Sequence, residues 1–240
     1  MADTPNGERC SKCEKPKSEL DGGLKRCAKC KTAYYCSRDC QKADWKDHKK
    51  TCGPTPGSAN NTNANTTNAR QQSKVLSVTI DKPFHKLDSK TWLHDRPEED
   101  VYKLLVDTYR MKVEDTYALE GEVFSDSIYG GARDGGRRGF RRFLKRVESK
   151  PGLLPSWWSP EKANACVRYG TNSNNWSDLA CAAEKSDIIE HYGERMMPMQ
   201  LRMFGEQVYG RGPGGYDGTA MRELQMLVEN GSAQVHTVNR

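Results

Sequence analysis

The first 52 residues concentrate the side chains that bind metal ions. Seven of the nine cysteines lie there, together with a histidine four residues before the last of them. In a reducing compartment such a cluster predicts metal binding rather than disulfides, and thiolate and imidazole are ligands that zinc prefers. The ligands form four pairs, enough for two tetrahedral zinc sites. The pairs are Cys10 and Cys13, Cys27 and Cys30, Cys36 and Cys40, and His48 and Cys52.

The spacing within each pair suits one shared ion. A C-x2-C turn points both sulfurs at one ion, and C-x3-C or H-x3-C on a helix places both ligands one turn apart on the same face. His48 is therefore predicted to be a ligand, paired with Cys52. The alternative is an exposed histidine on a basic helix, which leaves the second site incomplete. Spacing alone allows either successive or alternate pairs to share an ion. Each site would have four protein ligands and no open position for a catalytic water.

This part of the chain resembles the MYND zinc finger. The resemblance rests on the spacing of the eight predicted ligands and on the stretch YYCSRDCQKADWKDHKKTC at residues 34–52. The resemblance covers residues 10–52, and its loose feature is the long loop between Cys13 and Cys27. It implies interleaved zinc binding, with the first and third pairs on one ion and the second and fourth on the other. The implied ligand sets are Cys10, Cys13, Cys36 and Cys40 for one zinc, and Cys27, Cys30, His48 and Cys52 for the other.

The resemblance also implies protein–protein recognition, typically of short proline-containing peptides, with transcriptional regulation as one setting. Gln41 and Trp45 match the positions that line the family's peptide groove, so they are candidate contacts. The alternative for Trp45 is packing against the zinc-binding loops. A bound segment would lie extended along a small hairpin near Ala33 to Cys36, as an added strand.

Composition divides the chain into three parts. Residues 8–52 form the predicted finger, and residues 53–74, rich in Asn, Thr, Pro and Gly, are predicted to be a flexible linker. Residues 75–240 are predicted to form a mainly α-helical domain. The expected fold is thus a small cross-braced dizinc finger, with a short hairpin and short helices, tethered to a helical domain.

Cap residues and glycine stops divide the helical part into short elements. A strand is expected at 74–80. Helices are expected over 97–119, 139–150, 159–170, 176–193, 197–210 and 218–231. The sequences DRPEEDVYKLLVDTYR and EKSDIIEHYG resemble segments that accompany this finger in uncharacterised fungal proteins, a resemblance that supplies no activity.

The charge of the chain gives little support for nucleic-acid binding. The formal charge is +6, and residues 1–52 carry 13 Lys and Arg against 8 Asp and Glu. Seven thiolates on two zinc ions contribute a net charge of −3. The finger's lysines are therefore interpreted largely as compensating the negative charge of the metal sites. Residues 133–146 hold seven basic residues beside Phe140 and Phe143, and RNA or an acidic partner is the alternative function there. The favoured interpretation is a solvated helix face with the phenylalanines in the core.

An enzyme in the helical region is the remaining alternative. Asp187, Glu190 and His191 lie within about one helical turn, but no second cluster completes a site. The methionines of MMPMQLRMF and the tryptophans of PSWW are predicted to fill the core. SET-methyltransferase and His-x-Asp hydroxylase motifs are absent, so a non-enzymatic adaptor is predicted. Without a signal core or an apolar run of about 18 residues, the nucleus or cytoplasm is expected and no membrane.

Overall fold

The computed structural model describes residues 9–20, 23–27, 30, 32–48, 51–52 and 75–231. Buried apolar side chains there form two clusters, one within residues 10–52 and a larger one within residues 84–208. The predicted linker, residues 53–74, lies outside the described residues. The elements in order are η1 (Lys17–Glu19), β1 (Lys25–Arg26), β2 (Tyr34–Tyr35), α1 (Arg38–His48), α2 (Pro83–Asp88), α3 (Glu98–Leu119), α4 (Arg137–Glu148), α5 (Pro160–Gly170), α6 (Lys185–Tyr192), α7 (Met197–Tyr209), η2 (Pro213–Gly215) and α8 (Thr219–Glu229).

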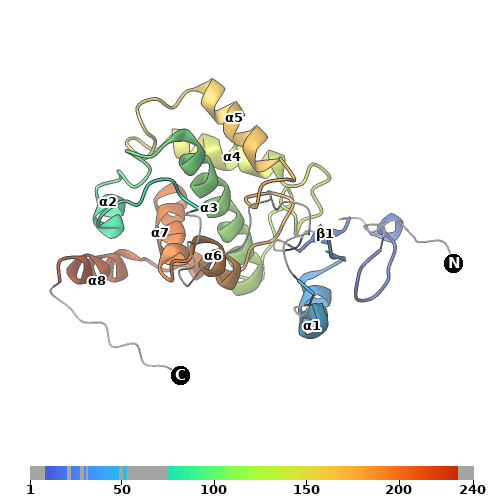
Figure 1. Cartoon of the computed structure of the whole chain (residues 1–240). Coiled ribbons are helices and arrows are strands. Elements are labelled where there is room, and N and C mark those ends of the chain that lie inside the picture. The colour runs from blue at the N-terminus through green and yellow to red at the C-terminus, as the bar shows by residue number, and fades with distance from the viewer. Residues whose placement is uncertain are drawn as a thin grey trace, which may run out of the picture.

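The long helix α3 passes through the middle of the helical region, with α4, α5 and α7 packed around it (Figure 1). It begins after Pro97, and its first turn carries Glu98, Glu99 and Asp100, whose negative charges suit a helix N-terminus. Val101, Leu104 and Leu105 are fully buried. Nearly all side chains between residues 100 and 116 are buried, so α3 presents core on every side.

Two oppositely charged side chains of α3, Asp107 and Arg110, are buried and bond to each other and to neighbouring elements. The Asp107 carboxylate accepts hydrogen bonds from Arg110 Nη1 at 2.7 Å, Ser177 Oγ at 2.9 Å and Tyr192 Oη at 2.6 Å. Arg110 Nε also donates to the backbone oxygen of Cys181 at 3.0 Å. Because a buried charge needs compensating bonds, this network holds α3 to α6 and to the loop before it.

The predicted helices are present, with one change of extent. Ser159 caps α5 by accepting a hydrogen bond from the Lys162 N–H, as its position predicted. The segment predicted to be helical from residue 176 becomes helical only at Lys185. A capping box between Glu184 and Asp187 begins α6 there, and residues 176–184 form a buried loop.

The predicted strand at 74–80 is wrong over residues 75–80, which contain no strand. The reason is a side chain: the Asp100 carboxylate accepts hydrogen bonds from Ser77 Oγ and the Val78 N–H, both at 3.1 Å. The helix α2 that follows was not predicted. No helix in the described part of the chain has the length and apolar character to span a bilayer.

The basic segment forms α4, as its apolar spacing predicted. Phe140 and Phe143 are buried in the core, whereas the arginine side chains along the helix are exposed. Gly139 lies where α4 meets α3, and a Cβ there would approach Tyr109 Oη to 2.1 Å. Glycine is therefore required for the close approach of the two helices.

Candidate metal centres and adjoining pocket

A hairpin and a capped helix position the metal-binding residues. Strands β1 and β2 pair antiparallel, and the Cys27 N–H donates to the Ala33 oxygen at 2.9 Å where the hairpin closes. Ser37 follows β2 and accepts a hydrogen bond from the Cys40 N–H at 3.2 Å, the N-cap arrangement expected for serine. The chain therefore turns directly from Cys36 at the end of the strand into α1, which carries the next ligand one turn later.

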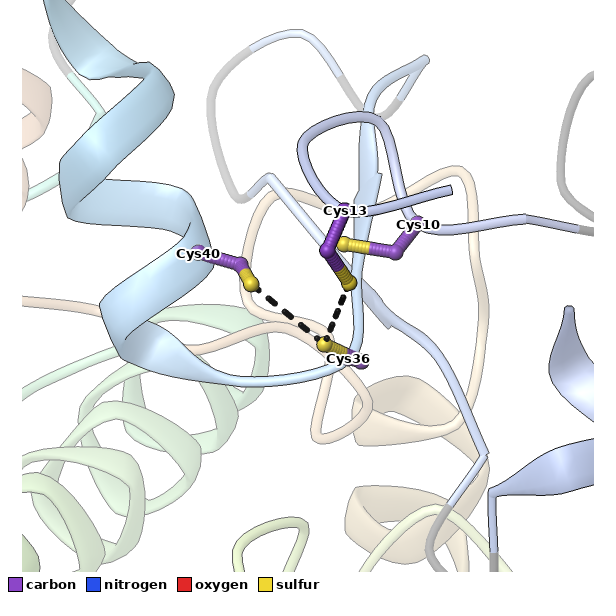
Figure 2. A group of neighbouring side chains, drawn as sticks. All are labelled: Cys10, Cys13, Cys36 and Cys40. Atoms are coloured by element: carbon purple, nitrogen blue, oxygen red, sulfur yellow. Dashed lines mark hydrogen bonds between the residues drawn. The ribbon is translucent and has the colours of Figure 1, made fainter. Parts of the chain in front are cut away.

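The first cluster joins a turn, the end of β2 and the first turn of α1 (Figure 2). The sulfur of Cys36 lies 3.4 Å from that of Cys13 and 3.5 Å from that of Cys40. The four sulfurs point toward one another and lie within 4.8 Å, Cys10 being the fourth. In a tetrahedral site with zinc–sulfur bonds of about 2.3 Å, sulfurs are about 3.8 Å apart. The spacing therefore fits a zinc ion.

The second cluster contains Cys27, Cys30, His48 and Cys52. The sulfurs of Cys27 and Cys52 are 3.7 Å apart, and the sulfur of Cys30 lies 3.5 Å from His48 Nε2. All three cysteines are buried. Alternate ligand pairs thus come together in space, the arrangement that the resemblance implies, and the successive pairing left open by spacing is not found.

The first cluster has an electrostatic need for a cation. N–H groups of Cys13, Cys36 and Lys12 outweigh the opposing effect of burial and lower the pKa of Cys10 to about 6. Burial and hydrogen bonds with the neighbouring thiols raise the pKa of Cys36 to about 12. Thiolates this close cannot all ionise without a positive charge among them. A divalent ion supplies it and displaces the protons, so these residues fit zinc.

Aromatic side chains pack around the second cluster. Tyr35 is buried, its ring meets the His48 ring edge-on at 5.9 Å, and its hydroxyl donates to Asp44 Oδ2 at 2.8 Å. Trp45 also contacts His48, with ring centroids 6.0 Å apart, yet it remains 43% exposed. Trp45 therefore both packs beside a zinc-binding residue and presents an open aromatic face.

That open face borders a pocket between the finger and α6. The finger pocket, as we term it, has a volume of about 270 Å³ and is lined by Gln41, Trp45, Glu184, Ser186, Asp187 and Glu190. Both residues predicted to contact peptide thus lie on one wall. The opposite wall comes from the part of α6 that suggested a catalytic cluster. The participation of α6 had no signal in the sequence.

The side chains of that suggested cluster have local contacts. Burial raises the pKa of Asp187, whose carboxylate accepts a hydrogen bond from the Glu184 N–H at 2.9 Å. The His191 ring stacks on the Trp176 ring at 3.7 Å, nearly parallel. Asp187 therefore caps the start of α6, and His191 packs against the loop before it.

A second contact joins the finger to the buried loop 176–184. Arg26 forms an ion pair with Asp178, and a parallel bridge pairs the backbone of Arg26 with Cys181. Lys25 Nζ lies 4.9 Å above the Tyr129 ring. The Asp178 side chain is almost fully buried, so its charge depends on Arg26 for compensation.

Replacing Arg26 by methionine is expected to loosen this contact. The Asp178 carboxylate would lose its cation, which costs about 1–3 kcal/mol for a buried charged acceptor. Hydrogen exchange of the amides of residues 179–181 should accelerate, while the zinc content stays unchanged. Arg9→Met, at an exposed position of the same finger, is the matched control. Unchanged exchange in the Arg26 variant would show that the ion pair contributes nothing to the contact.

The hairpin edges are occupied. The Tyr34 oxygen accepts from the Ser11 N–H at 2.6 Å, and the Tyr34 N–H donates to Ser11 Oγ at 3.1 Å. The Cys36 N–H points at the Cys10 sulfur, and β1 meets Cys181. An added strand along residues 33–36, the mode the resemblance suggested, would have to displace these bonds.

Comparisons with known proteins agree with the metal geometry. The family model described as MYND finger matches residues 9–52. A SET and MYND domain-containing protein of Dictyostelium discoideum is 45% identical over 82 residues, which cover 33% of this chain and 15% of that protein. The N-lysine methyltransferase SMYD2 of Homo sapiens is 44% identical over 48 residues, which cover 20% of this chain and 10% of that protein. Dauer abnormal formation protein 25 of Caenorhabditis elegans is 54% identical over 43 residues, which cover 18% of this chain and 10% of that protein.

Residues 9–52 are therefore a MYND finger with two structural zinc sites. MYND fingers are generally protein-interaction modules. Each relative is matched over only 10% to 15% of its own length. No solved structure matches the chain.

Proposed function

We propose that the chain is a non-enzymatic adaptor whose finger pocket captures short proline-containing segments of partner proteins. The observation that carries this proposal is the position of Trp45 and Gln41, which line the finger pocket. An exposed indole beside an amide offers a flat apolar surface and hydrogen-bonding groups, the combination that peptide-binding sites use. Transcriptional regulation, in the nucleus or cytoplasm, is the setting we propose.

The occupied hairpin edges favour side-chain recognition over strand pairing. Because Ser11 already bonds both backbone groups of Tyr34, a peptide gains few main-chain hydrogen bonds along β2. A proline, which lacks an N–H, loses nothing by packing on the Trp45 ring instead. The α6 wall, with Ser186 and Asp187, would then contact the residues beside the proline.

Trp45→Ala is expected to abolish peptide capture without releasing zinc. An aromatic anchor at the centre of a binding site typically contributes 2 kcal/mol or more, so affinity should fall by about 30-fold or more. The measurement is fluorescence polarisation of a labelled library of proline-containing peptides with the full chain, with zinc counted by elemental analysis.

Tyr216→Ala is the matched control, because Tyr216 is an aromatic residue that is 77% exposed and lies outside the pocket. It should bind peptides as the unaltered chain does. Equal binding by the Trp45 variant would count against the finger pocket, and so would a library with no ligand at all.

The zinc sites themselves support a structural rather than a catalytic function. Each has four protein donors within 4.8 Å of one another, which leaves no ligand position for a reacting water. The lysine methyltransferase activity in the name of the human relative belongs to a protein that this chain matches over only 48 residues. We therefore assign this chain the recognition function of the finger alone.

A further inference from the structure

A second groove is lined by residues of α4 and α5 and of the segment between them. These two helices lie at the top of Figure 1, apart from α1. The groove has a volume of about 520 Å³, within the range of about 300–1,000 Å³ found for ligand sites. This α4–α5 groove is independent of the finger pocket. Its apolar lining consists of Leu144, Leu154, Pro155, Trp158, Pro160, Ala163 and Val167.

Trp158 gives the groove a fixed aromatic wall. Its Nε1–H donates to Glu148 Oε1 at 3.1 Å, which satisfies the polar end of the indole. Its ring also meets the Tyr102 ring edge-on at 6.2 Å. An aromatic ring held in this way offers apolar surface at low entropic cost, as binding anchors do.

A stripe of cations borders the groove. Arg141 and Lys145 line it, and Arg137 lies one helical turn earlier on the same face of α4. With a rise of about 1.5 Å per residue, the stripe is about 12 Å long. All three side chains are exposed, and none forms an ion pair within the described residues. In contrast, Arg142 on another face pairs with Asp126.

We propose that the α4–α5 groove binds an acidic amphipathic helix of a partner protein. Apolar side chains of that helix would enter the groove, and carboxylates one turn apart would pair with Arg137, Arg141 and Lys145. The repeat of such carboxylates, about 6 Å, equals the repeat of the cations. The basic segment and the PSWW motif would thus form one recognition surface.

Other ligands fit these features less well. A small carboxylate would use one cation of a 12 Å stripe, as estimated from the helix rise. A nucleic acid would use the cations and would stack a base on Trp158, but it would gain little from the leucine, proline and alanine side chains that form most of the lining. The two longest stretches outside the described residues, 53–74 and 232–240, contain no Asp or Glu, so they lack the complementary charge.

The test uses the full chain and a fluorescein-labelled helical peptide of about 14 residues, a length that spans the groove with leucines on one face and glutamates one turn apart beside them. Fluorescence polarisation should show binding that falls about tenfold or more in Arg141→Glu/Lys145→Glu, because two attractions become repulsions. Asn164→Trp, at an exposed position of the groove, should block binding without removing any charge.

Arg138→Glu/Arg195→Glu is the matched control, since it makes the same charge change at exposed positions outside the groove and should bind as before. Circular dichroism verifies the fold of each variant. No binding by the unaltered chain would overturn the proposal, as would equal binding of a peptide with glutamine in place of glutamate. Tighter binding of a single-stranded oligonucleotide, weakened equally by both double variants, would assign α4 to nucleic acid instead.

Discussion

Cys36→Ala is expected to release zinc from the first cluster and to unfold the finger. The Cys36 sulfur lies within 3.5 Å of two other ligand sulfurs, so its loss leaves a three-donor site. Structural zinc contributes about 10–16 kcal/mol in finger peptides, and the finger's own buried cluster is too small to replace that contribution. The zinc content of the purified chain, measured by elemental analysis, should fall from two ions per chain to one or none.

Cys166→Ala is the control, because it removes a buried thiol that is far from both clusters in the sequence. It should retain both ions. Protease digestion should cut residues 10–52 rapidly in the Cys36 variant and slowly in the control. A Cys36 variant with two zinc ions per chain would refute the ligand assignment.

Asp107→Ala is expected to destabilise the helical region by about 3–5 kcal/mol, the range for removal of one partner from a buried ion pair. Asp107 and Arg110 are both almost completely buried, so the substitution leaves an uncompensated guanidinium as well as unpaired Ser177 and Tyr192 hydroxyls. Chemical denaturation should show the loss, and the melting temperature should fall by about 10 °C or more.

Two variants bracket this result. Asp107→Asn retains an acceptor for Ser177 and Tyr192 but removes the negative charge, so its loss of stability should be intermediate. Glu223→Ala removes an exposed carboxylate of α8 and should change stability by no more than about 0.5 kcal/mol. An Asp107→Ala chain as stable as the Glu223 variant would show that the network is dispensable.

The metal sites and most helices were predictable because their determinants are local. Ligand spacing places two donors on one turn, and caps such as Ser159 act within three residues of their own position. The prediction that the helix α6 begins at residue 176 failed for a non-local reason. The segment 176–184 contributes Ser177 to the Asp107 network and Asp178 to the finger, contacts that a helical periodicity does not reveal.

Contacts between distant parts of the sequence could not be predicted from one chain. Arg26 and Asp178 are 152 residues apart, and neither occurs in a motif. The same holds for the finger pocket, whose walls come from α1 and α6. Gln41 and Trp45 were predicted to contact peptide only through the family resemblance, and that contact stays a prediction.

The bonds of Ser11 and Cys181 to the hairpin have a consequence for solution behaviour. Unpaired strand edges act as templates on which further copies of a chain assemble into aggregates. Here a turn covers Tyr34 and the loop before α6 covers Arg26. We therefore expect the intact protein to resist edge-to-edge self-association at high concentration, and a finger expressed without residues 75–240 to be the more aggregation-prone species.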